Sequence, residues 1–110
     1  MEVVEVYQNY ARMRLPINGN RNHLGTMYAS SILAVAEING GSVMISHLGN
    51  GLFDEFEPLI VGVDLNFRKV PQTDVYVELT VSKERLEKIP VQTRLKGKYF
   101  FNFESELSDE

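Results

Sequence analysis

TMYASSILAVAEI, residues 26–38, is the stretch from which the fold class can be read. It contains no proline or glycine and is longer than a typical strand, so it predicts an α-helix. Asn39-Gly40-Gly41 follows directly and is a natural helix stop. Asn22 or Thr26 would cap the first backbone amides of this helix, and the sequence leaves both alternatives open.

The predicted helix is apolar on nearly every side. Its large hydrophobic residues are spread over more than one face: Met27, Tyr28, Ile32, Leu33, Val35 and Ile38. Since such a helix is normally enclosed by other structure, we expect it at the centre of the domain. Thr26, Ser30 and Glu37 form a thin polar stripe, in which Glu37 lies two turns, about 10 Å, beyond Ser30 on one face.

The second half of the chain alternates apolar and polar residues with period two, as half-buried strands do. The first run covers 59–67 and the second 75–81, and we expect them to pair as a hairpin through the turn at Pro71. Further strand candidates are 99–107, 11–17 and 42–47. These elements predict an α+β fold, a curved antiparallel sheet of about five strands wrapped round one long central helix.

One sheet of this size leaves part of an all-round apolar helix uncovered. A second copy of the chain would bury the exposed helix faces, and two sheets could then meet edge to edge. We therefore expect a homodimer, or a dimer of dimers, as the stable unit.

Composition excludes several classes of protein. The 110 residues suit one domain, and the chain has no cysteine and only two histidines, so a disulfide framework, a thiol nucleophile and a metal site are not expected. A formal charge of -4 argues against nucleic-acid binding. No uninterrupted apolar run approaches the length of about 18 residues that spans a bilayer, and the acidic N-terminus is unlike a signal peptide. We expect a cytoplasmic protein without a membrane span.

The helix region carries the resemblance to a known family. The motifs are Asn22-His23-Leu24-Gly25-Thr26-Met27-Tyr28-Ala29, then Leu33-Ala34-Val35-Ala36-Glu37, then Gly40-Gly41. From about Met13 to Leu107 the chain resembles the DUF4442 group of hotdog-fold, thioesterase-like proteins. This resemblance implies that residues 1–110 form a single hotdog domain. Relatives usually continue past the strand at 99–107 into one more strand, so either the domain lacks a final C-terminal strand or the sequence is a fragment. Without that strand, the sheet would have an unpaired edge.

The resemblance also implies acyl transfer from a thioester to water. In related phenylacetyl-CoA-type acyl-CoA thioesterases a His-Gly-Gly opens the helix and an acid lies within it. By spacing these fall on Tyr28-Ala29-Ser30 and on Glu37, so the acid is retained and the His-Gly-Gly is not. The implied substrate is an acyl thioester of coenzyme A or of an acyl carrier, with coenzyme A as part of the substrate and no separate cofactor.

The expected catalytic residues are Glu37 and Asn22. Glu37 would act as base or nucleophile, and partial burial would raise its pKa toward a useful range. Backbone amides around Tyr28 and Ala29 would stabilise the oxyanion at the helix start. Asn22 would position water or the thioester oxygen, with Ser30 in support.

Each candidate also has a purely structural interpretation. Glu37 could be an exposed or arginine-paired carboxylate, Asn22 a plain helix cap, and His23 a loop residue. His47 is expected to be a turn neighbour outside the site. Accordingly, the second functional hypothesis is a hotdog module that binds an acyl thioester or another apolar ligand without turnover. An acid in a cleft would favour the enzyme, and an acid locked in a salt bridge would favour the binding module.

Basic residues in the second half, Arg68 among them, could contact the phosphates of coenzyme A. The competing interpretation is an ordinary solvated surface. The alternating signs of 83–88, KERLEK, favour a solvated connection at that point.

Overall fold

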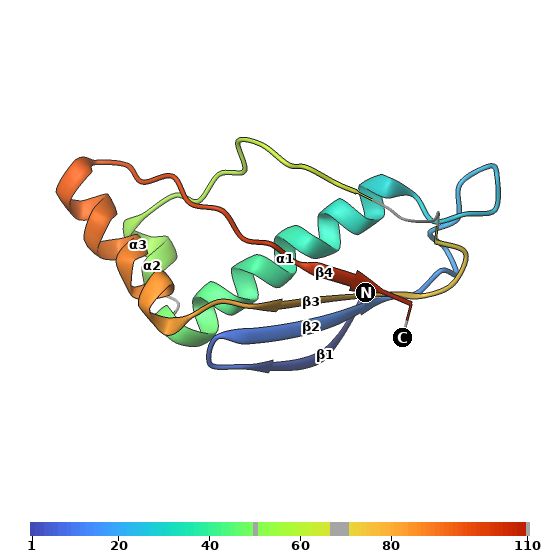
Figure 1. Ribbon diagram of the computed structural model, residues 1–110, viewed down its shortest axis with the longest axis horizontal. Coiled ribbons are helices and arrows are strands. Elements are labelled where there is room, and N and C mark those ends of the chain that lie inside the picture. Colours follow the sequence, from blue (N-terminus) through green and yellow to red (C-terminus); the bar gives the residue numbers. More distant parts are fainter. Residues whose placement is uncertain (50, 67–70, 110) are drawn as a thin grey trace.

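The computed structural model describes residues 1–49, 51–66 and 71–109. Its elements in chain order are β1 (Glu2–Tyr7), β2 (Tyr10–Leu15), α1 (Ala29–Leu48), α2 (Leu52–Glu55), β3 (Val75–Thr80), α3 (Lys83–Lys96) and β4 (Glu106–Ser108). One antiparallel sheet has the order β1-β2-β3-β4, and α1 runs along one face of it (Figure 1). The predicted α+β fold, an antiparallel sheet packed against a long central helix, is confirmed, with four strands in the described part of the chain.

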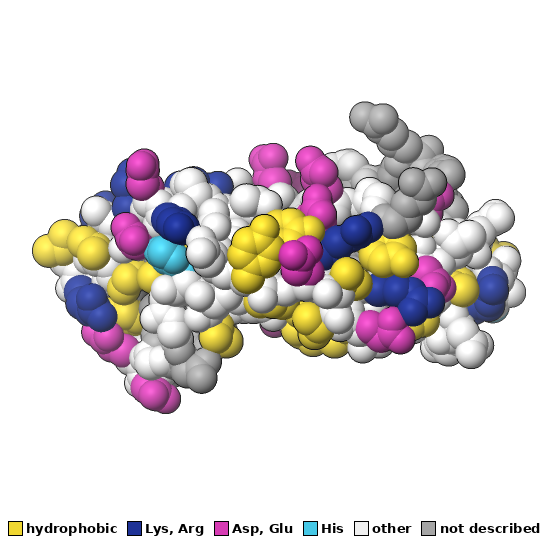
Figure 2. Space-filling view, turned by 90° about the horizontal axis from the view of Figure 1, so that it is seen from below, with side chains coloured by type: hydrophobic (Ala, Val, Ile, Leu, Met, Phe, Trp, Pro, Cys, Tyr) yellow, Lys and Arg dark blue, Asp and Glu magenta, His cyan; other side chains and the backbone are white. Residues whose placement is uncertain are grey.

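The two central strands follow the period-two pattern closely. Ala11, Met13 and Leu15 of β2 are buried, and Met13 is paired with the fully buried Val77 of β3. The side chains between them point to the opposite face. Figure 2 shows this outer face, where charged side chains of both signs lie among hydrophobic ones. The strands predicted at 11–17 and 75–81 are therefore confirmed with slightly different ends, whereas β1 was not predicted.

The central helix is longer than predicted. It starts at Ala29 and continues through Gly40 and Gly41 to Leu48, so the expected stop and the expected strand at 42–47 are both wrong. The reason is packing that the local sequence does not reveal. A Cβ atom on Gly40 would lie 3.7 Å from the Phe103 side chain, and Val43, one turn later, is fully buried.

Two buried clusters lie along the contact between α1 and the sheet. One combines Val43 and Met44 with Leu79 of β3 and with Leu86 and Ile89 of α3. The other joins the first half of α1 to β2 and β3; its buried members are Met13, Leu15, Met27, Ile32, Val35, Val75 and Val77. The core thus extends along nearly the whole helix.

The run at 59–67 does not form the predicted strand. Residues 59–66 have no regular secondary structure, residue 67 lies outside the described ranges, and β3 pairs with β2 and β4, so the expected hairpin is wrong. Alternation marks one apolar face, but a strand also requires a hydrogen-bonded neighbour. Leu65 packs against the core, whereas the side chains of Leu59 and Val61 are 74% and 76% exposed.

The final third also differs from expectation. Only Glu106–Ser108 of the third run is a strand, with the preceding residues extended but unpaired in the described structure. The expected solvated connection at 83–88 is instead the start of α3. Ser82 caps this helix by accepting a hydrogen bond from the backbone N–H of Arg85 at 3.3 Å, and Gly97 ends it in the left-handed conformation.

By length and composition alone, α1 could cross a membrane. The core helix of a domain can meet the same criteria, and α1 packs against β2 and β3. Only 28% of the most apolar 18-residue stretch of α1 is buried within one chain. A single copy therefore leaves much of the helix surface uncovered.

Candidate functional site

The loop before α1 is organised by Asn22. Its side-chain oxygen accepts hydrogen bonds from the backbone N–H groups of Leu24 at 2.9 Å and Thr26 at 3.1 Å. Its amide nitrogen donates to the Thr26 hydroxyl at 2.8 Å. Neither residue caps α1, because the helix is preceded by Tyr28, which makes no side-chain capping bond. Asn22 therefore shapes the loop with the same polar atoms that were expected to position water.

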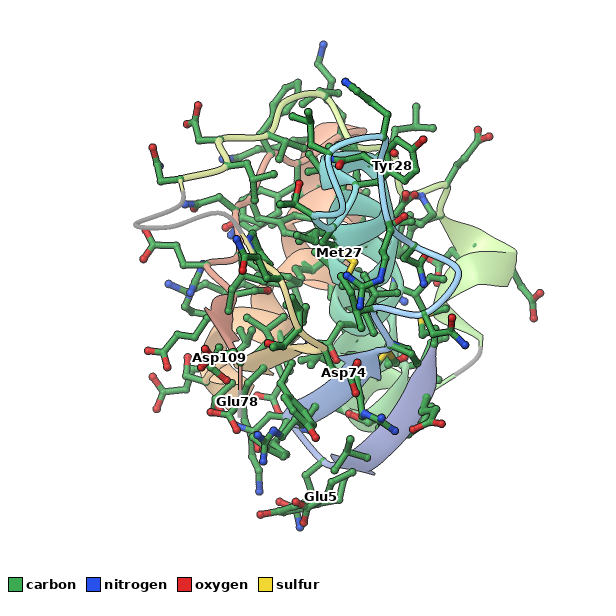
Figure 3. The ribbon with its side chains drawn as sticks, turned by 90° about the vertical axis from the view of Figure 1, so that its right-hand side faces the viewer. Glu5, Met27, Tyr28, Asp74, Glu78 and Asp109 are labelled. Carbon is green, nitrogen blue, oxygen red and sulfur yellow. The ribbon has the colours of Figure 1, made fainter. Side chains whose placement is uncertain are left out.

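Backbone hydrogen bonds hold the start of α1 in place. The N–H of Met27 donates to the carbonyl of Pro71 at 3.0 Å, and the N–H of Tyr28 donates to that of Asn20 at 2.9 Å. Figure 3 shows Met27 directed toward the interior and Tyr28 farther from the sheet, and the two side chains are 3% and 47% exposed. The Tyr28 amide is therefore already used.

Two backbone amides at the start of α1 remain available as hydrogen-bond donors. Within the described ranges, the N–H groups of Ala29 and Ser30 have no hydrogen-bond acceptor. The first N–H groups of a helix lack partners inside it and lie at the positive end of its dipole. A developing negative charge would therefore find its donors at Ala29 and Ser30.

Glu37 lies on the face of α1 that the sheet leaves open. It shares this face with Ser30, seven residues earlier, and with the exposed residues Leu33 and Ala34. No ion pair or hydrogen bond of its carboxylate is found among residues 1–49, 51–66 and 71–109. The side chain is exposed in a single copy, so the partial burial expected from the sequence is not present in one chain.

The remaining candidates lie elsewhere or outside the described ranges. Arg68 belongs to the part that the structure does not describe. His23 is exposed in the loop, and His47 lies in the last turn of α1, where its Nε2 is 3.1 Å from Glu87 Oε1 of α3. In the described part of the chain no three His, Cys, Asp or Glu residues could hold a metal ion together.

The most strongly bonded carboxylate near the helix start belongs to Asp74. It accepts hydrogen bonds from the backbone N–H of Ile17 at 2.8 Å and from Arg14 Nε at 2.9 Å. These bonds, with the backbone contribution first, lower the pKa of Asp74. Arg14 also pairs with Glu2 at 2.6 Å. Asp74 thus ties the loop after β2 to the start of β3, a structural task rather than a catalytic one.

A second carboxylate, Glu78, bonds to an aromatic hydroxyl on the outer face of the sheet. The Tyr10 hydroxyl donates to Glu78 Oε2 at 2.6 Å, and this bond, followed by burial, raises the pKa of Tyr10 to about 12. In Figure 3 Glu78 and Glu5 lie on the sheet side of the molecule, away from Tyr28. This pair is therefore remote from the open face of α1.

Sequence reasoning missed a hollow between α3 and the extended chain that follows it. Its lining combines the basic Arg85 and Lys88 of α3 with aromatic residues of 99–103. The signals that could have revealed α3 are the Ser82 cap and the stop at Gly97, fourteen helical residues apart. Pro90 lies inside this stretch, and a proline in a helix interior normally disrupts the helix.

Comparison with known proteins places this geometry in a family. The family model "Domain of unknown function (DUF4442)" matches residues 1–109. The structure of PA5026 from Pseudomonas aeruginosa, a protein of unknown function described as a probable thioesterase, superposes with a TM-score of 0.81 at 31% identity. That match covers 98% of this chain and 70% of PA5026.

A second solved structure supports the fold alone. The conserved protein PA5202 from Pseudomonas aeruginosa matches with a TM-score of 0.59 and 21% identity, over 73% of this chain and 62% of its own. No curated protein matches. Since the family model covers almost every residue and the fold matches throughout, the chain belongs to the DUF4442 family, with the hotdog fold of its thioesterase-like members.

Proposed function

We propose that the protein is a thioesterase that hydrolyses an acyl-CoA, or an acyl group on a carrier, at an interface between two copies of the chain. The single observation that carries this proposal is the open face of α1. Among the described residues, its Glu37 carboxylate has no partner and lies two turns from the amides of Ala29 and Ser30, which have no acceptor there either. The probable thioesterase role of PA5026 supports the same reaction class.

These groups match the requirements of thioester hydrolysis. The Glu37 carboxylate takes a proton from a water molecule, whose oxygen attacks the thioester carbonyl. The carbonyl oxygen becomes an oxyanion, which the N–H groups of Ala29 and Ser30 stabilise. When the intermediate collapses, the carbon–sulfur bond breaks and the thiolate receives the proton that Glu37 carries. In the nucleophilic variant, the carboxylate attacks the carbonyl directly, and the carbon–sulfur bond breaks and releases the thiolate. Water then cleaves the resulting anhydride, which restores the Glu37 carboxylate and supplies the proton that the thiolate takes up.

The distance between these groups supports a site shared by two copies. With a rise of about 1.5 Å per residue, Glu37 lies roughly 10–12 Å along α1 from Ser30 and Ala29. One carbonyl group cannot contact both ends of that distance. Two α1 helices that pack antiparallel through their open faces would bring Glu37 of one copy to the helix start of the other. The exposed Leu33 and Ile38, at 36% and 46%, would be buried in this contact.

The second candidate is a binding module without turnover. It is favoured by the residues Tyr28-Ala29-Ser30, which stand where related thioesterases have His-Gly-Gly. The side chains of Ala29 and Ser30 project where a glycine would leave room for a thioester to approach the helix amides. In this case the same surface would hold an acyl thioester or another apolar ligand.

Thiol release from short, medium, long and aryl acyl-CoAs distinguishes these alternatives. We expect Glu37→Gln to lower turnover by a factor of about 10² or more, because it keeps the shape of the side chain and removes the base. Glu5→Gln, an identical change on the far side of the molecule, should leave turnover unchanged. If turnover survives Glu37→Gln, the thioesterase reaction stands, but Glu37 is not its base or nucleophile.

Two further results would change the proposal. No thiol release from any substrate, with a folded protein, would favour the binding module. A monomeric mass by sedimentation at micromolar concentration would contradict the site at the interface, whatever the activity.

A further inference from the structure

The hollow beside α3 is lined by basic and aromatic side chains. It is a cavity of about 270 Å³ to which α3 contributes Arg85 and Lys88 and the following chain contributes Tyr99 and the run Phe100–Phe103. The rings of Phe100 and Phe101 are 69% and 40% exposed, although large aromatic side chains are normally buried. Exposed rings next to basic side chains mark a surface suited to a ligand.

The aromatic rings form a connected series. The centroids of Tyr99 and Phe101 are 6.1 Å apart with planes inclined at 26°, and those of Phe101 and Phe103 are 5.2 Å apart. The Arg85 guanidinium lies 5.9 Å from the centroid of Phe103. Phe103 in turn packs against Gly40, less than one turn beyond Glu37. The series therefore leads from the hollow to the helix that carries the proposed base.

The side chains of the lining favour a ligand that combines a flat aromatic ring with phosphate groups. Aromatic side chains stack on nucleobases, and guanidinium and ammonium groups pair with phosphates. The chain has a net charge of -4, yet α3 and the residues just after it are locally basic; the basic residues there are Lys83, Arg85, Lys88, Arg94, Lys96 and Lys98. We propose that this hollow binds the adenine nucleotide end of coenzyme A, an inference that rests on the proposed acyl-CoA substrate.

The position of the hollow agrees with the shape of an acyl-CoA. In that molecule the phosphorylated adenosine and the thioester lie at opposite ends of a flexible pantetheine arm. Glu37 and His47 are separated by ten residues, about 15 Å along α1, and His47 contacts Glu87 of α3 at 3.1 Å. A nucleotide held beside α3 would direct the arm along α1 toward Glu37. An acyl carrier protein presents no adenine, so the aromatic series favours coenzyme A.

Calorimetric titration with adenosine 3′,5′-bisphosphate tests this site without requiring turnover. We expect binding to the unmodified protein and a loss of affinity of about tenfold or more in Lys88→Gln, because a phosphate loses a charged partner. Lys96→Gln removes the same charge from the last turn of the same helix, outside the hollow, and should bind normally. Phe100→Leu, at a largely exposed position, should also weaken binding by about tenfold through lost stacking.

The outcomes separate this proposal from the proposed function. No binding of the nucleotide, or equal losses in Lys88→Gln and Lys96→Gln, would overturn the site. If the unmodified protein binds the nucleotide and hydrolyses no thioester, the site stands and the thioesterase proposal fails. If acyl-CoA is hydrolysed with the same KM in the unmodified protein and in Lys88→Gln, the function stands and the site fails.

Discussion

Asn39 offers a sharp test of how α1 is held against the sheet. It is fully buried, and its Nδ2 donates to the Ala11 carbonyl of β2 at 3.3 Å. Its Oδ1 is buried and has no hydrogen-bond partner in the described residues. Replacement by aspartate would retain the volume, remove the donor to Ala11 and bring a carboxylate into a fully buried site.

The expected effect of Asn39→Asp is large. An uncompensated buried charge costs about 3–5 kcal/mol, a large share of the 5–15 kcal/mol that stabilises an ordinary domain. Burial raises the pKa of the new carboxyl above its unfolded value of about 3.9. The free energy of unfolding of the variant therefore falls as pH rises above that unfolded value, because the folded state must either retain a proton on the carboxyl or bury its charge. At low pH the protonated carboxyl can again donate to Ala11, so the deficit should shrink.

Urea unfolding at neutral pH and near pH 4 measures both predictions. Asn9→Asp is the matched control, since Asn9 Nδ2 donates to the Val81 carbonyl at 2.6 Å from a site that is only partly buried. We expect this control to lose about 1 kcal/mol. Asn39→Leu, which removes the unpartnered oxygen together with the donor, should be milder than Asn39→Asp. Equal losses with equal pH dependence for Asn39→Asp and Asn9→Asp would refute the reasoning.

Three further predictions address single contacts. The pKa of Asp74 is lowered in the folded state, so Asp74 stabilises the protein at pH values above its ordinary pKa of 3.8. This stabilisation is lost as pH falls through the folded pKa. In Asp74→Asn, Tm should therefore fall less steeply with decreasing pH. Because the pKa of Tyr10 is raised to about 12, its contribution to stability is complete below pH 10.0 and is lost as pH rises toward 12. In Tyr10→Phe, the free energy of unfolding should therefore fall less steeply with pH in alkali. Gly41 has open space around the position of a Cβ atom, so Gly41→Ala should raise stability by about 0.5–1 kcal/mol in thermal unfolding, and a loss would show that the helix needs a glycine there.

The part of the fold that could be predicted is the part with local or regular signals. Period-two alternation identified β2 and β3, and the apolar stretch at 26–38 identified the central helix. The motif around that helix indicated the family. Ser30 and Glu37 were predicted to share a face, and helical geometry over Ala29–Leu48 places them so.

Strand pairing is the feature that alternation could not supply. Runs 59–67 and 75–81 have equally regular patterns, yet residues 59–66 are not a strand, whereas β3 lies between two hydrogen-bonded neighbours in the sheet. Likewise, Asn22 was predicted as a possible cap of the helix, but its side chain bonds within the loop at Leu24 and Thr26, and α1 begins only at Ala29. Strand neighbours and the hydrogen-bond partners of side chains both depend on the three-dimensional fold, which a local sequence pattern does not contain.

The double glycine in α1 shows how a strong local signal is overruled. Two glycines within a helix cost roughly 1–2 kcal/mol relative to alanine, which is why Gly40-Gly41 predicted a stop. Continuing the helix buries Val43 and Met44, which are 0% and 6% exposed, and each such side chain contributes about 1.5–3 kcal/mol. Burial therefore outweighs the glycine penalty. The residues that cover this turn, Leu86 and Ile89 among them, come more than forty positions later in the chain, so no local reading of 39–47 could detect them. Phe103 packs against Gly40 in the same turn. The glycine that was predicted to end the helix is therefore the position at which the aromatic series contacts α1.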